Sequence, residues 1–140
     1  PELSSERIEE LAALRALLEP ELSARALPRA HMALIERMEA INATIAEAVA
    51  RRDAVGYSRT NLEFHRTLYL RAQGPAMLAL NGTVWLQLGP TMRALYGRLR
   101  RTEPPHHHRL IIAALKAGDE PGLRLAVRAD VTQGLKLLVS

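Results

Sequence analysis

Asn61 and His65 are the first residues whose types and spacing suggest chemistry. They lie four positions apart in a segment with a helical pattern, and positions i and i+4 of a helix share one face. The same face carries Tyr57, Phe64 and Leu68, so the amide and the imidazole are expected to point toward the interior. Polar partners for them should lie on the buried faces of other helices.

Two further polar residues interrupt apolar stripes later in the chain. His108 shares a helical face with Ile111 and Leu115, and Asp130 shares one with Val127. A buried carboxylate without a partner costs several kcal/mol and is rarely left uncompensated. A cation is therefore expected to face Asp130, and it could be an arginine, a protonated histidine or a metal ion.

Taken together, Asn61, His65, His108 and Asp130 predict a metal site. Two imidazoles, a carboxylate and an amide on inward faces of three helices suit a first-row divalent ion, with Zn or Ni ahead of Mg or Ca. Each residue alone has a simpler explanation. The histidines could be hydrogen-bonded core residues, and Asp130 could pair at the surface with an arginine of its own helix. The histidine run at 106–108 could be a solvated loop.

The elements that must position these residues are all predicted to be helices, because apolar residues recur at spacings of three and four. The expected ranges are about 4–26, 28–53, 57–73, 77–96, 108–118 and 120–140. Pro20 and the pair Gly89-Pro90 are expected to kink or break their helices, and Gly56 should lie just ahead of the third. The predicted fold class is all-α, an antiparallel bundle of about six to seven helices.

Composition narrows the class of protein. The 140 residues are 48% apolar and 24% charged, as in a single globular domain. No apolar run approaches the roughly 18–20 residues that cross a bilayer, and the absence of cysteine excludes disulfides and thiolate metal sites. A cytoplasmic protein without a membrane partner is expected. The arginines are scattered beside acidic residues and aromatic residues make up 4%, which argues against nucleic-acid binding by this chain.

Several segments resemble a known family. The segment Asn61-Leu-Glu-Phe-His65, the run from His108 to Ala-Gly-Asp119, and a polar residue eleven positions later resemble the effector-binding (FCD) domain of the FadR subfamily of GntR-type transcription regulators. Arg15-Ala-Leu-Leu-Glu19 resembles the Arg-x-x-Leu-Glu element of that family's first helix. The likeness covers nearly the whole chain. It implies a single ligand-binding and dimerising domain over 1–140, preceded by a DNA-binding winged helix outside this chain.

The resemblance also implies a ligand set for the metal. The family's usual set is an Asp four residues before a His, with two further His residues, and a small carboxylate beside the metal. His65 and His108 match as ligands, whereas Asn61 stands in place of the Asp and Asp130 in place of the last His. Compared with the family's usual set, the carboxylate ligand would come from the last helix and not from the helix of His65, and one histidine nitrogen is lost. Weaker or altered metal binding is expected, and the alternatives are an empty site or Asn61 as a hydrogen-bond partner only.

Three residues are candidates for holding an anionic effector. Arg15 comes first, because a guanidinium group matches the geometry of a carboxylate, and Arg93 and Tyr96 follow. Arg15 could instead form an ordinary surface pair with Glu19, four residues later.

The sequence leaves several functions open. The leading hypothesis is a sensor domain of a regulator, which would not bind DNA specifically by itself. A metalloenzyme could use the same residues, but Glu63 should point away from them and no other general base is evident. A metal-free helical enzyme that binds a dicarboxylate would need more than the two lysines present. A structural dimerisation module, with the polar cluster fully hydrogen-bonded, is the last alternative.

Overall fold

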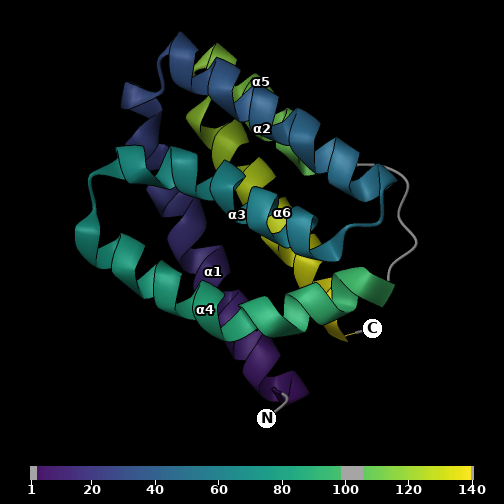
Figure 1. Ribbon diagram of the computed structural model, residues 1–140. Coiled ribbons are helices and arrows are strands. Elements are labelled where there is room, and N and C mark those ends of the chain that lie inside the picture. Colours follow the sequence, from purple (N-terminus) through teal and green to yellow (C-terminus); the bar gives the residue numbers. More distant parts are fainter. Residues whose placement is uncertain (1–2, 99–105, 140) are drawn as a thin grey trace.

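The structure, a computed structural model, describes the backbone of residues 3–98 and 106–139 and the side chains of residues 3–94 and 106–133. Within these ranges the α-helices are α1 (Ser5–Ala26), α2 (Met32–Ala50), α3 (Ala54–Tyr69), α4 (Pro75–Arg98), α5 (His106–Ala117) and α6 (Glu120–Val139) (Figure 1). Short 3-10 turns follow α1 at Leu27–Arg29 and α3 at Leu70–Ala72. No strand occurs in the described ranges, so the predicted all-α bundle of six to seven helices is confirmed. None of the described helices combines the length and apolarity that a membrane span requires.

Two hydrophobic clusters hold the helices together. The larger one gathers buried side chains from α1, α2, α3, α5 and α6, among them Leu22, Ile45, Phe64, Ile111 and Val127. The smaller one lies between α1 and α4. α6 packs against both α1 and α5, and α3 packs against both α2 and α4. The helices α3, α5 and α6, which carry the predicted metal site, therefore face one core.

Helices α3 and α6 begin with the same local device. Asp53 caps α3 by accepting a hydrogen bond from the Gly56 N–H (2.9 Å), and Asp119 caps α6 by accepting one from the Gly122 N–H (3.0 Å). A Cβ atom at either glycine would collide with the capping carboxylate, so glycine leaves room for the cap. Gly56 accordingly lies in the first turn of α3, and the prediction that it precedes the helix is wrong.

The start of α2 also differs from the prediction. Pro28 falls in the 3-10 turn Leu27–Arg29, and α2 begins only at Met32. The imidazole of His31 caps this helix by accepting a hydrogen bond from the Leu34 N–H at 3.3 Å. A proline in a first turn is a common start signal, but here it opens a separate turn ahead of the histidine cap.

The two interior prolines do not end their helices. α1 continues through Pro20, and α4 is one helix from Pro75 to Arg98 that includes Pro90 and bends partway along (Figure 1). An interior proline costs a helix about 3 kcal/mol. In α1 the residues on both sides of the proline, such as Leu11 and Leu22, are buried in the core, and this packing holds both halves in place.

Candidate metal centre and adjoining cavity

His65, His108 and Asp130 meet in the interior between α3, α5 and α6. The Nε2 atom of His65 lies 3.0 Å from Asp130 Oδ2, and Nε2 of His108 lies 3.5 Å from the same oxygen. One ligand-type atom from each residue lies within 4.8 Å of the others. The two histidines are buried and the Asp130 side chain is 12% exposed. We call these three residues the metal centre, as a candidate site.

Each imidazole is oriented through its other ring nitrogen. His65 Nδ1 lies 3.1 Å from the Tyr69 hydroxyl oxygen, and His108 Nδ1 lies 3.1 Å from Asn42 Oδ1. The Tyr69 hydroxyl donates its hydrogen to Glu19 Oε1 (2.7 Å), and an amide oxygen can only accept. Both Nδ1 atoms must therefore carry the hydrogen of the neutral ring. This leaves both Nε2 atoms as lone-pair acceptors.

While both rings are neutral, the metal centre is consequently a set of acceptors without a donor. Neither Nε2 atom makes a hydrogen bond with a described residue, although both are buried, and an ionised carboxylate also only accepts. A buried polar atom without a partner is unfavourable by about 1–3 kcal/mol. A cation at the point that the three atoms share would interact favourably with all of them. Two imidazoles and a carboxylate suit Zn or a related first-row ion.

Phe64 fixes the plane of the His108 ring. The two rings stack with centroids 4.1 Å apart and planes at 8°. The His65 and His108 rings are nearly perpendicular, at 82° with centroids 5.2 Å apart. α3 therefore supplies one member of the metal centre and, through the neighbouring Phe64, also orients another.

On the opposite side of His65, Glu19 is the centre of a closed hydrogen-bond network. Its Oε1 accepts from the Tyr69 hydroxyl, and its Oε2 accepts from Arg15 Nε (2.6 Å) and from Trp85 Nε1 (2.9 Å). The Arg15 guanidinium carbon also lies 4.1 Å from the centre of the Trp85 ring, which is a cation–π distance. All four side chains are buried. We call Arg15, Glu19, Tyr69 and Trp85 the Glu19 network.

These contacts shift the pKa values of Asp130 and His108 in the metal centre and of Glu19 in the Glu19 network. Burial opposes ionisation of Asp130, but hydrogen bonds and charge from His108 and His65, when these rings are protonated, outweigh it and hold the pKa of that carboxyl well below its usual range. Burial lowers the pKa of His108, which keeps its imidazole neutral and available as a ligand. Burial also opposes ionisation of Glu19, yet Arg15 holds the Glu19 pKa below its ordinary value. Both carboxylates are therefore charged in the interior.

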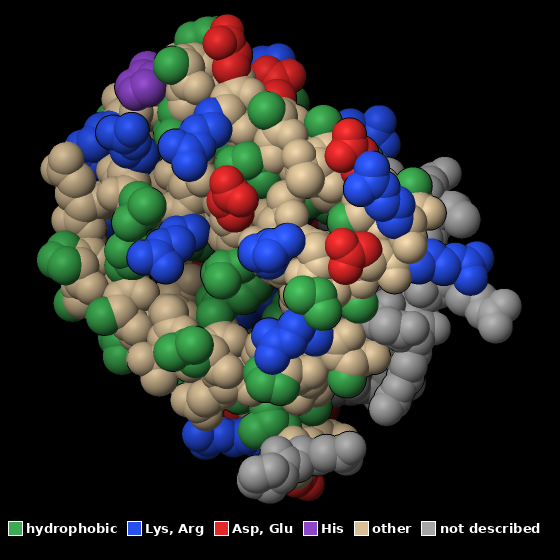
Figure 2. All heavy atoms as spheres, in the orientation of Figure 1, with side chains coloured by type: hydrophobic (Ala, Val, Ile, Leu, Met, Phe, Trp, Pro, Cys, Tyr) green, Lys and Arg blue, Asp and Glu red, His purple; other side chains and the backbone are tan. Residues whose placement is uncertain are grey.

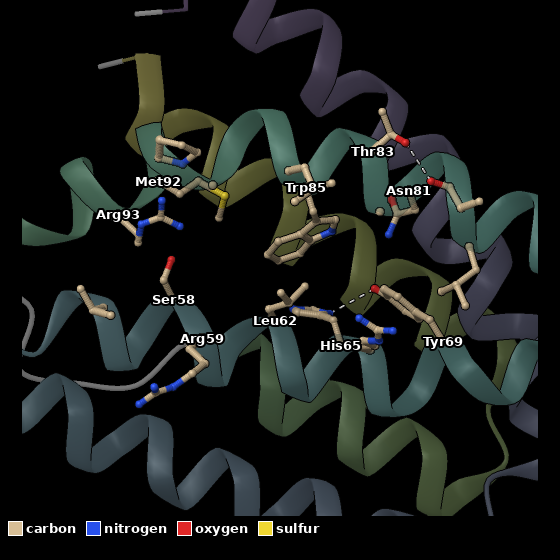
Figure 3. A pocket seen from close by; sticks show the side chains of 18 of the residues that line it. Ser58, Arg59, Leu62, His65, Tyr69, Asn81, Thr83, Trp85, Met92 and Arg93 are labelled. Atoms are coloured by element: carbon tan, nitrogen blue, oxygen red, sulfur yellow. Dashed lines mark hydrogen bonds between the residues drawn. The ribbon is translucent and has the colours of Figure 1, made fainter.

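A cavity of about 870 Å³ lies between α3 and α4, and His65 forms part of its wall (Figure 3). Apolar side chains such as Leu62, Trp85, Leu86 and Met92 line most of it. Figure 2 shows a hollow on the face where α3 and α4 lie, with hydrophobic side chains in it and basic side chains around it. The volume is in the range of about 300–1,000 Å³ that is usual for small-molecule sites.

The remaining predicted site residues have different surroundings. Asn61 is 6% exposed and lies one turn before His65 on the buried face of α3. Arg15 pairs with Glu19, as the alternative hypothesis proposed, but the pair is in the interior and not at the surface. Arg93 is exposed and lines the cavity. The side chain of Tyr96 lies outside the described residues.

Three partners of the site were missed by reasoning from the sequence. Tyr69 lies four residues after His65, so the helical spacing that links Asn61 to His65 could have found it. Asn42 and Trp85 lie on other helices, each 66 positions from its partner. No pattern in the sequence connects residues at such separations.

Comparisons with known proteins agree with this fold. The family model described as FCD domain matches residues 10–133. The HTH-type transcriptional regulator McbR of Escherichia coli (strain K12) is 23% identical over 141 residues, which cover 99% of this chain and 64% of that protein. The solved structure of E. coli McbR/YncC matches with a TM-score of 0.89 and 22% identity, over 99% of this chain and 70% of the other. The chain thus spans about two-thirds of the length of these relatives and shares their fold.

Proposed function

Since this chain belongs to the FCD domain family, we propose that it is the ligand-sensing and dimerising domain of a GntR-type transcription regulator of the FadR subfamily. A divalent cation would be bound by the metal centre, and a small carboxylate effector would bind at or beside it. A winged-helix domain preceding this chain would bind DNA, and the full-length protein would act as a homodimer in the cytoplasm. The similarity to the regulator McbR supports this role over an enzymatic one.

The three acceptor atoms of the metal centre carry the proposal. Zn or Ni is favoured over Mg or Ca because two of the three donors are imidazole nitrogens. When bound, a divalent cation would retain a positive charge beside the single carboxylate of Asp130 and could attract an anionic effector. Tyr69 and Asn42 would keep the two rings in the tautomer that binds metal.

The other predicted contacts keep secondary roles in this proposal. Asn61 would offer a neutral amide oxygen to the cation or hydrogen-bond the effector, from its buried position one turn before His65. Arg93 would reach the effector from the wall of the cavity. Arg15 would act indirectly, because Glu19 and Trp85 already engage its guanidinium. A contact from Tyr96 stays a prediction.

Elemental analysis of the purified chain and two histidine variants tests the metal centre. The wild-type chain should contain about one Zn or Ni per molecule, and His108→Ala should lose it. His106→Ala is a matched control, because His106 is exposed on the same helix and outside the metal centre. Equal loss in both variants would indicate adventitious binding to the histidine run, and an absence of metal from all three proteins would remove the site.

DNA binding tests the domain assignment. Effector binding would shift the population between dimer arrangements and so change the operator affinity of the full-length protein. This chain alone should give no sequence-specific retardation in a gel-shift assay. Specific retardation by the isolated chain would contradict the assignment of DNA binding to a separate domain.

A further inference from the structure

We propose that the effector carries two acidic groups joined by an apolar spacer, and that Arg93 and Ser58 bind the outer acid at the far end of the cavity. The inference rests on the proposed function, because it takes the inner acid to lie beside the metal centre at His65. It defines a ligand class, elongated dicarboxylates, and a second anion-binding subsite between α3 and α4.

The outer subsite is a pair of donors without an acceptor. Arg93 on α4 and Ser58 on α3 both line the cavity and point toward each other across it (Figure 3). Arg93 has no carboxylate partner and Ser58 makes no hydrogen bond among the described residues. A guanidinium can only donate, and a hydroxyl can donate as well. Arg59, beside Ser58, also lines the cavity, but its guanidinium points away from Arg93 and Ser58 in Figure 3. An anion between them would satisfy both donors.

Gly89 helps to place the Arg93 side chain. A Cβ atom on Gly89 would lie only 3.3 Å from Arg93 Nη1, so the guanidinium lies close over the backbone of its own helix at this point. Both residues line the cavity. The missing side chain at position 89 therefore gives the guanidinium room within the cavity.

The stretch between the two ends of the cavity is apolar. Ser58 precedes His65 by seven residues on α3, or about 10 Å at 1.5 Å per helical residue. Leu62, between Ser58 and His65 on α3, is 39% exposed, and Leu86 (81% exposed) and the buried Met92 also line the cavity. A hydrocarbon spacer would cover these side chains and gain from their burial. The two acids should therefore be about 10 Å apart.

Asn81 lines the end of the cavity remote from Arg93 (Figure 3). It is 3% exposed, lines the cavity, and its Oδ1 has no hydrogen-bond partner among the described residues. Figure 3 shows its amide nitrogen directed toward the cavity on the same side as Tyr69, remote from Arg93. The unpartnered Oδ1 is an acceptor and would need a donor, whereas the amide nitrogen is the part of this side chain that could serve an acid. The N–H group of Asn81 is available to an oxygen of the inner acid.

Trp85, the single tryptophan of the chain, lines the cavity and supplies a fluorescence signal for binding. The probes are octanoate and octanedioate, which have the same length but one and two acids, added to the chain loaded with Zn²⁺. The dicarboxylate should bind about tenfold tighter or more, since its outer acid gains a charge-assisted hydrogen bond that octanoate lacks. Arg93→Gln should remove this advantage without changing octanoate binding, and Ser58→Ala should reduce it.

Arg37→Gln is the matched control, because it removes the same charge from an exposed position on α2 outside the cavity. It should leave the preference for the dicarboxylate intact. Zn²⁺-dependent binding of both acids with equal affinity would overturn the second subsite and leave the proposed function standing, as would equal weakening of both acids by Arg93→Gln. If neither acid binds with or without Zn²⁺, the proposed effector class and this inference both fail.

Discussion

The two ring nitrogens of His65 face two different kinds of polar environment. On the Nδ1 side, the Glu19 network joins α1, α3 and α4, and Arg15 Nε, the Tyr69 hydroxyl and Trp85 Nε1 each donate to Glu19 at 2.6–2.9 Å. On the Nε2 side, three acceptor atoms from α3, α5 and α6 gather without a donor. Both groups are buried and both contain a carboxylate. Only the second is left chemically incomplete.

The comparison distinguishes buried polar side chains that stabilise the fold by pairing with one another from those that remain available to bind a ligand. Buried polar groups in proteins are nearly always hydrogen-bonded, and the exceptions call for an explanation such as a missing ion. The Glu19 network needs nothing further, because the charges of Arg15 and Glu19 are paired. The two Nε2 atoms of the metal centre have no hydrogen-bond partner among the described residues. Tyr69 belongs to the Glu19 network and also contacts Nδ1 of His65. The Glu19 network therefore helps to position the metal centre.

The largest effect is expected from breaking the Glu19 network. Glu19→Ala leaves the charge of Arg15 buried without a counterion and removes the acceptor from Tyr69 and Trp85. The free energy of unfolding should fall by about 3–5 kcal/mol, measured by urea denaturation with far-UV circular dichroism on metal-free protein. Glu10→Ala is the control, because Glu10 pairs with Arg7 at the surface and such pairs contribute about 0–1 kcal/mol. Equal losses in the two variants would contradict the role of the network.

Asp130→Asn should give the opposite pattern. Metal affinity should fall by more than about 100-fold, since even a supporting hydrogen bond to a ligand is worth about 10–100-fold. At a pH where both imidazoles are neutral, metal-free protein should keep its stability or gain about 1 kcal/mol, because an amide N–H can donate to an Nε2 acceptor. Chelator competition measures the first quantity and denaturation the second. A stability loss like that of Glu19→Ala would identify Asp130 as a structural residue.

Tyr69→Phe tests the link between the two groups. Removing the hydroxyl releases His65 Nδ1 and should weaken metal binding by about 10–100-fold, with a loss of about 1 kcal/mol in unfolding free energy. Thr60→Val is a suitable control, because the Thr60 hydroxyl is buried on the same helix but bonds only the Gly56 carbonyl. The control should lose stability and retain metal affinity. The link is disproved by unchanged affinity in Tyr69→Phe.

On acidification, the metal centre should lose its metal at a higher pH than that at which the Glu19 network loses its contribution to stability. The lowered pKa of Asp130 keeps that carboxylate ionised, so protonation of His108 decides when metal leaves. Metal content should fall as the pH drops below about 6.5, and the lowered pKa of His108 moves its protonation to lower pH. The lowered pKa of Glu19 means that its contribution to stability persists above the unfolded value of about 4.3 and is lost only below it. At about pH 5 the chain should remain helical by circular dichroism but hold little metal; simultaneous unfolding and metal loss would contradict this separation.

Much of the fold was predictable because helical spacing is a local property. The buried face of α3, with Tyr57, Phe64 and Leu68, follows from periodicity alone. The same reasoning put His65, His108 and Asp130 on inward faces. It also allowed for α4 as one helix with a kink, and α4 does bend (Figure 1), but it did not foresee that α1 continues unbroken through Pro20, because the packing that holds α1 comes from distant residues.

The partners of the site were less predictable. Asn42 orients His108 from α2, and Trp85 joins Glu19 from α4. Arg15 shows most clearly what the sequence could not predict. Its spacing to Glu19 predicted an ion pair between the two residues, but that pair was expected at the surface. The structure buries that pair beneath Trp85, and periodicity gives no information about which helix covers another.

The sequence by itself determined which side chains face inward, because the order of apolar residues along a helix sets its buried face. It also determined the chemical types available for a site, two imidazoles and a carboxylate on separate helices. Only the tertiary structure decided that these three meet at one point, that their hydrogen-bond donors are used elsewhere, and that a cavity adjoins them. The height and rotation at which helices pack depend on every contact across the core, and no single segment encodes them.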